Sequence, residues 1–199
     1  ERLGMTTRLA ANVSQRQIAR PDFFAQVRHA MTRHRATADL LELELTESIA
    51  MQMDDTALAG IARLREQGAT VAIDEFGTGY TNLARLKDLP VDRVKIDRSF
   101  VSDLPDDANN AGITGAIIAI AHHLKLTVVA EGVENAMEMA FLQAHHCDQA
   151  QGYYFSKPVD AAQAERLLRK GRLFPVGSAD SGKPGPAEWT ETARLLRVS

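Results

Sequence analysis

Apolar and polar residues alternate along six short stretches of the chain, which is the two-residue period of a β-strand. In TVAIDEF, which begins at Thr70, Val71 and Ile73 point one way and Asp74 the other. Two glycines end this stretch. The six expected strands cover residues 8–13, 40–45, 70–76, 93–97, 127–130 and 148–153.

Between these strands, apolar residues recur at helical spacing. The expected helices start near residue 21 and cover about 54–67, 83–89, 111–124, 135–144 and 160–170. Strands and helices therefore alternate strictly. This order is typical of consecutive βα units and predicts an α/β fold with a parallel sheet or barrel.

The composition changes after the last expected helix. Residues 171–186 are rich in Gly, Ser and Pro, which is typical of a linker, and residues 189–198 have the pattern of a short amphipathic helix. We therefore expect one domain over residues 1–172, followed by a linker and a short helix over residues 173–199.

Composition and charge narrow the class of protein. Of 199 residues, 45% are hydrophobic and 25% charged, as in soluble globular proteins. With a net charge of −3, the chain has no excess of basic residues of the kind that binds DNA or RNA. A single cysteine, Cys147, excludes a disulfide framework and a cysteine zinc site. No apolar run approaches the roughly 20 residues of a membrane span, and ERLGMTTRL lacks the core of a signal peptide. We expect a cytoplasmic domain, either alone or as part of a larger, membrane-anchored protein.

One face of the expected sheet carries a polar residue near the end of every strand. These residues are Asn12, Glu44, Asp74, Lys95, Glu131 and Gln151. Exposure to solvent on an outer face of the sheet would explain any one of these residues. In a parallel sheet, however, both faces are covered, so alternating solvent-exposed residues are not expected. In a TIM-like barrel the active site lies at the C-terminal strand ends. We therefore expect the six side chains to converge there.

The adjacent carboxylates Asp74 and Glu75 have no basic residue within five positions on either side. Two such groups repel each other unless a cation or a proton lies between them, although a solvated turn also favours Asp and Gly. Oxygen ligands suit a hard cation such as Mg²⁺ or Mn²⁺ better than zinc. Carboxylates that can hold two metals, beside a lysine, suit attack of water on a phosphodiester.

Two other patterns have simpler interpretations. The pairs His122-His123 and His145-His146 lie on expected helices, where neighbours point in different directions, so we interpret them as surface or packing residues. Residues 77–79 follow a strand and Asp97 comes 20 positions after Gly77, as in a dinucleotide-binding fingerprint. The third glycine position, however, holds Asn82, and two carboxylates would face the pyrophosphate.

The sequence DEFGTGYTNL, which begins at Asp74, closely resembles the DDFGTGYSSL signature of EAL domains, the bacterial cyclic di-GMP phosphodiesterases. LELELTES, LPVDRVKIDRSFV, VVAEGVE and QGYYFSKP resemble the other motifs of that family, in the same order, over about residues 8–170. The resemblance implies a modified TIM (β/α)8 barrel. It also implies hydrolysis of cyclic di-GMP to linear pGpG, with two Mg²⁺ or Mn²⁺ ions per site, in second-messenger signalling.

The resemblance also implies roles for individual residues. The implied metal ligands are Asn12, Glu44, Asp74, Glu75 and Glu131, and the implied catalytic residues are Lys95, which holds the attacking water, Glu131, and Gln151, which helps to position it. Glu47 would brace the loop after Asp74, which in the family links the metal site to dimer formation, so a homodimer is expected. Supporting roles fall to Glu47, Phe76, Gly77, Thr78, Gly79, Asp97 and Glu134.

Two departures from the family pattern matter. The Glu-Ala-Leu motif is absent, and about six βα units are present where a barrel needs eight. We therefore expect an N-terminally incomplete chain, with the motif, and a diguanylate cyclase or sensory domain, upstream. Glu75 stands where the family usually has Asp, and a displacement of about 1 Å can cost on the order of 10²-fold in rate. The alternatives are a degenerate, inactive EAL domain that binds cyclic di-GMP or a protein, and a pure dimerisation module.

Overall fold

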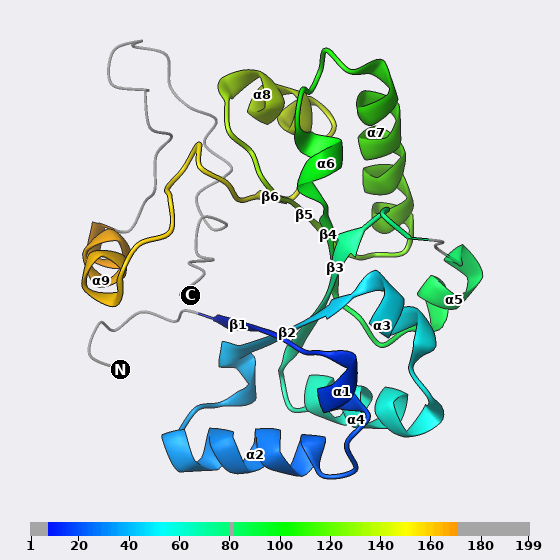
Figure 1. Ribbon diagram of the computed structural model, residues 1–199, viewed down its shortest axis with the longest axis vertical. Coiled ribbons are helices and arrows are strands. Elements are labelled where there is room, and N and C mark those ends of the chain that lie inside the picture. The colour runs from blue at the N-terminus through cyan, green and yellow to red at the C-terminus, as the bar shows by residue number, and fades with distance from the viewer. Residues whose placement is uncertain (1–7, 80–81, 171–199) are drawn as a thin grey trace.

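A computed structural model describes residues 8–79 and 82–170 of the chain. In this part of the chain, six parallel strands form one sheet in the order β1-β2-β3-β4-β5-β6 (Figure 1). The strands are β1 Leu9–Asn12, β2 Leu41–Thr46, β3 Thr70–Phe76, β4 Arg93–Ile96, β5 Thr127–Ala130 and β6 Gln149–Ala150. The sheet curls into an incomplete, TIM-like barrel, so the predicted fold class is confirmed.

Ten helical segments in the described residues connect the strands and flank the sheet. They are α1 Gln15–Ile18, α2 Phe23–His34, η1 Ala38–Leu40, α3 Glu47–Gln52, α4 Asp55–Glu66, α5 Leu83–Asp88, α6 Arg98–Val101, α7 Ala108–His123, α8 Ala136–Ala144 and α9 Ala161–Lys170. In Figure 1, α6 to α8 lie over one half of the sheet, α1 to α4 lie over the other, and α9 stands apart.

The longer helices lie where the apolar period predicts them, but the period does not reveal α1, α3, α6 and η1. Segments of three to six residues make fewer than two turns, which leaves little room for a repeat; α5, also six residues long, is predicted from Leu83, Leu86 and the Pro90 that follows it. Capping residues mark two of these starts. Ser14 and Gln17 form a capping box at α1, and Asp97 accepts a hydrogen bond from the Ser99 backbone N–H at α6.

The last strand is shorter than the sequence predicts. The expected strand covers 148–153, whereas β6 contains only Gln149–Ala150. Its pairing with β5 ends at Ala130–Ala150, and just beyond, the Gly152 backbone lies so close to the Val133 backbone that a side chain would collide with it. The expected linker and helix over residues 173–199 lie outside the described residues.

Both faces of the central strands β2 to β5 are largely buried, as expected for a parallel sheet, whereas the edge strands β1 and β6 are partly exposed. Along β2, Leu43 and Leu45 belong to the apolar core, while Glu42 and Glu44 point to the opposite, concave face. Nevertheless Glu42 is 0% and Glu44 5% exposed. The alternation in LELELT therefore separates an apolar core from a polar interior, rather than a core from solvent.

No helix in the described part of the chain is long and apolar enough to span a membrane.

Candidate active site

A β-bulge at the end of β3 sets the directions of Asp74 and Glu75. Ile73 pairs with Val94 but Phe76 pairs with Ile96, so β3 contains one extra residue here. Glu75 takes up the irregularity with a left-handed backbone, φ 55°. Asp74 stays buried on the concave face, whereas Glu75 is exposed. The two carboxylates are thus neighbours in sequence that differ in surroundings, although both line the same cavity.

Lys95, on β4, lies at the centre of the polar residues. Its side chain is 1% exposed. The Nζ atom is 2.7 Å from Glu44 Oε1, 3.2 Å from Asp74 Oδ1 and 2.6 Å from Glu131 Oε1. Strands β2, β3, β4 and the residue after β5 therefore meet at this one ammonium group.

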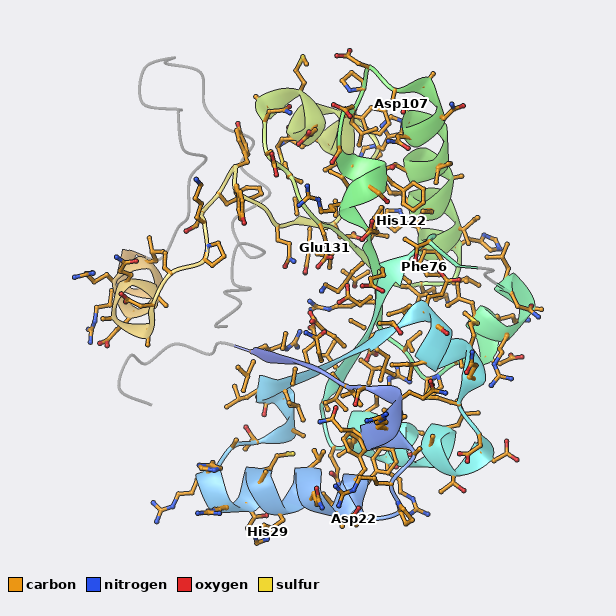
Figure 2. All side chains as sticks on the ribbon, in the orientation of Figure 1. Asp22, His29, Phe76, Asp107, His122 and Glu131 are labelled. Carbon is orange, nitrogen blue, oxygen red and sulfur yellow. The ribbon has the colours of Figure 1, made fainter. Side chains whose placement is uncertain are left out.

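The two predicted amides complete the group. Gln151, just after β6, donates a hydrogen bond from Nε2 to Glu131 Oε1 at 2.7 Å. Asn12, at the end of β1, pairs in register with Glu44 and lines the cavity above the cluster. The structure therefore brings all six predicted side chains to one end of the sheet. In Figure 2, Glu131 lies near the middle of the sheet, well away from His29 on α2 and Asp107 at the start of α7.

The pKa values in the cluster follow from burial and charge. Burial alone would lower the pKa of Lys95, but the carboxylates of Glu131, Asp74 and Glu44 together raise it above its ordinary value. Lys95 therefore stays protonated. Burial raises the pKa of Glu131, and the charge of Lys95 opposes that rise. One ammonium compensates only one of three carboxylates, so an ionised cluster keeps an excess of negative charge that favours a further cation.

The donor chemistry of the site fits a hard divalent cation, although the described residues hold no ready-made ligand set. Within residues 8–79 and 82–170, no three Asp, Glu, His or Cys side chains surround a common point as metal ligands. The Nζ atom of Lys95 lies among the carboxylates of Glu44, Asp74 and Glu131. Asn12, Glu44, Asp74 and Glu75 all line the cavity, and their side-chain oxygens are of the kind that Mg²⁺ and Mn²⁺ prefer.

The loop after β3 rests on Glu47, the first residue of α3. Glu47 is buried, and its Oε2 accepts a hydrogen bond from the Gly77 backbone N–H at 2.9 Å. A side chain at Gly79 would also meet Glu47, since a Cβ there would lie 2.9 Å from Oε1. Thr78 Oγ1 donates to the Glu75 carbonyl at 2.8 Å, and Phe76 belongs to the core. The Gly77 N–H is thus already engaged, and α5 begins only at Leu83, so the loop does not form a dinucleotide-binding turn.

Asp97 and Glu134 both line the cavity. Asp97 also caps α6, and the Glu134 backbone N–H donates to Glu138 Oε2 at 2.7 Å. Glu138, which is buried and forms a capping box with Asn135, is not among the predicted residues. The Asn-x-x-Glu spacing before an apolar helix was the available signal.

The histidine pairs lie away from the cluster. His122 Nε2 lies 2.9 Å from Asp148 Oδ2, and the His145 ring stacks on Phe141 with centroids 4.0 Å apart. These contacts agree with a packing or surface role.

The cavity over the strand ends has a volume of about 930 Å³, near the upper end of the range for small-molecule sites. The carboxylates form its floor, and two cationic side chains, Arg98 and Lys157, lie on its walls. The exposed Tyr153 ring also lines it, with Lys157 Nζ 5.7 Å from the ring centroid. The cavity therefore combines an acidic floor with positive and aromatic groups suited to an anionic ligand with flat rings.

An incomplete TIM-like barrel with an acidic cluster around a lysine at its strand ends defines the class of protein. The EAL domain family model matches residues 1–158, and the chain belongs to this family. It is 44% identical over 166 residues to the cyclic di-GMP phosphodiesterase NbdA of Pseudomonas aeruginosa, which is 83% of this chain and 21% of NbdA. The chain thus spans about a fifth of the length of this relative.

Solved structures give the same result. The PaMucR phosphodiesterase in complex with c-di-GMP has a TM-score of 0.75 and 39% identity, covering 79% of this chain and 64% of the other. The manganese and cyclic di-GMP complex of Klebsiella pneumoniae BlrP1 has a TM-score of 0.70 and 29% identity, covering 78% and 40%. The fold predicted from the sequence is therefore that of solved EAL proteins.

Proposed function

We propose that this domain hydrolyses cyclic di-GMP to linear pGpG with the help of divalent metal ions, in bacterial second-messenger signalling. The observation that carries the proposal is the convergence of Glu44, Asp74 and Glu131 on Lys95 at the floor of the cavity. Membership of the EAL family and the cyclic di-GMP complexes of its solved relatives supply the substrate class.

Each residue has a distinct task in this proposal. Asn12, Glu44, Asp74, Glu75 and Glu131 would hold the two Mg²⁺ or Mn²⁺ ions. Bound there, they would supply Lewis-acid chemistry at the phosphodiester. Lys95 orients the attacking water, and Gln151 holds the Glu131 carboxylate in place by its 2.7 Å hydrogen bond. Water adds to one phosphorus, one P–O bond to a ribose oxygen breaks, and the departing oxygen takes up a proton.

The walls of the cavity bind the rest of the substrate. Arg98 and Lys157 can pair with phosphate oxygens, and the exposed Tyr153 ring offers a stacking surface to a guanine base. The loop after Asp74 carries the proposed homodimer contact, because Glu47 holds its Gly77 backbone N–H while Thr78 and Gly79 are exposed. A diguanylate cyclase or sensory domain is the proposed upstream partner.

The test is hydrolysis of cyclic di-GMP by the full-length protein with Mn²⁺, followed by chromatographic detection of pGpG. Lys95→Met is expected to reduce the rate about 10²- to 10⁴-fold, and Lys87→Met, at an exposed lysine of α5, should leave it unchanged. Absence of pGpG from the wild-type protein at any Mn²⁺ concentration would overturn the proposal.

Glu75 favours one second candidate, a non-hydrolysing regulatory module that binds cyclic di-GMP or a protein. Its carboxylate is exposed on a left-handed backbone, where the family usually has Asp. Isothermal titration calorimetry with Mn²⁺ separates the two candidates. Tight binding of cyclic di-GMP with no pGpG formed supports the regulatory module, and turnover excludes it.

A further inference from the structure

A second polar layer lies beneath the Lys95 cluster and repeats its chemistry. Residues two apart on a strand point to the same face, about 6.6 Å from each other along the strand. Two positions before Glu44, Lys95 and Gln151, the strands carry another carboxylate, cation and amide, namely Glu42, Arg93 and Gln149. Barrel interiors are usually filled by branched apolar side chains at such positions, so a polar triad here, with Glu42 buried and Arg93 and Gln149 half-buried, needs a reason.

Arg93 connects the two sides of the curled sheet. Its Nη1 donates a hydrogen bond to Gln149 Oε1 at 3.1 Å and lies 3.2 Å from Glu42 Oε2. Gln149 belongs to β6 and Glu42 to β2, and three strands separate them in the sheet order. One guanidinium group therefore spans the concave side of the sheet directly below the site.

The buried Glu42 carboxylate relies on Arg93 for a compensating charge. The Glu42 side chain is 1% exposed, and neither of its oxygens accepts a well-aligned hydrogen bond from the described residues. Arg93 is its ion-pair partner within the described part of the chain. Because an unpaired buried carboxylate is costly, Glu42 and Arg93 hold each other in place.

We propose that Arg93 is a positioning residue for the candidate active site. It fixes the separation of β2 from β6, and thereby the separation of Glu44 from the Gln151–Glu131 pair one layer above. Close packing transmits such a shift along a strand with little loss, and a misplacement of about 1 Å can reduce a rate on the order of 10²-fold. The metal and substrate in this inference rest on the proposed function.

The test compares Arg93→Met, Arg93→Lys and the double variant Glu42→Met/Arg93→Met in the full-length protein. The double variant leaves no buried charge unpaired but does not restore the link to Gln149. Arg63→Met, at an exposed arginine of α4, is the control. Three quantities are measured: the ¹⁵N-labelled side-chain amide signal of Gln151 by NMR, Mn²⁺ affinity from the free-ion EPR signal, and kcat and KM for cyclic di-GMP.

We expect Arg93→Met to move the Gln151 signal, weaken Mn²⁺ binding several-fold and lower kcat by up to about 10²-fold, with KM nearly unchanged. The double variant should keep these defects, although it leaves no buried charge unpaired. Arg93→Lys should partly restore the Gln151 signal, Mn²⁺ binding and kcat. Lysine keeps the positive charge, but its ammonium group reaches fewer partners than the guanidinium group does.

Wild-type behaviour of the double variant in all three measurements would overturn the proposal, since Arg93 would then only neutralise Glu42. If Arg93→Met does not fold, Arg93→Lys and the double variant still decide the question. If the wild-type protein neither binds Mn²⁺ nor forms pGpG, the proposed function fails. The Gln151 signal then still tests the link independently.

Discussion

The Lys95 ammonium lies 2.7 Å from the Glu44 carboxylate, although the two residues are 51 positions apart in the chain. Strand β3 lies between their strands, and it contributes Asp74 to the same ammonium group at 3.2 Å. The Lys95 ammonium therefore holds the ends of β2, β3 and β4 together. The stability of the fold and the proposed chemistry depend on the same atoms here.

Lys95→Met should destabilise the protein by about 3–5 kcal/mol at pH 8 without metal, because it leaves buried carboxylates without their cation. Burial already raises the pKa of Glu131, and without Lys95 that pKa rises further. A carboxyl group whose folded pKa exceeds its unfolded pKa loses stabilising free energy as pH rises through the folded value. The loss should therefore be smaller at pH 5 than at pH 8. Urea unfolding at both pH values measures it, with Lys87→Met as control, and equal losses at both would contradict the argument.

Glu75→Asp should stabilise the protein by up to about 1 kcal/mol. Glu75 has φ 55°, and a short side chain such as Asp tolerates the left-handed region better than Glu. If the domain is a phosphodiesterase, the same change should also raise kcat, by up to about 10²-fold.

Urea unfolding and pGpG formation test both expectations for Glu75→Asp. Glu66→Asp, on the exposed side of α4, is the matched control for removal of one methylene. A variant less stable and no more active than wild type would show that Glu75 makes contacts that outweigh its backbone strain.

Glu47→Gln should loosen the loop after β3 at the Gly77 backbone N–H. That N–H donates to Glu47 Oε2 at 2.9 Å, and hydrogen bonds to charged groups contribute about 1.5–3 kcal/mol. Hydrogen exchange at Gly77 should become faster. If the loop forms the proposed homodimer, sedimentation velocity should also show weaker dimerisation. Glu66→Gln serves as control, and unchanged exchange at Gly77 would show that the carboxylate charge does not brace the loop.

Cys147 should resist alkylation in the folded protein and react once the chain unfolds. The residue is 3% exposed, and burial raises the pKa of its thiol to about 12. Because only the thiolate reacts, iodoacetamide at pH 8 should modify the native protein on the order of 10³-fold more slowly than an ordinary thiol. Mass spectrometry with and without urea measures this. Equal rates in both conditions would mean that the loop before β6 opens in the native state.

The sequence by itself determined the order of strands and long helices, because the strand period and the helix period can each be detected in a run of consecutive residues. It also determined which end of each strand carries polar groups, as Asn12, Glu44 and Lys95 illustrate. Parallel strands share their C-terminal edge, so these residues had to meet somewhere along it. The same local signals gave the family, since its motifs are short and contiguous. Helices as short as α1 and α6 carried no period and were missed.

Only the tertiary structure decided how the groups meet. It placed Lys95 between three carboxylates, gave Glu75 a left-handed backbone at a bulge, and paired Glu42 with Arg93 across the concave side of the sheet. Each of these depends on strand register and on the curl of the sheet. Those features arise from packing between residues that lie tens of positions apart. Such packing cannot be inferred from the local pattern of apolar and polar residues.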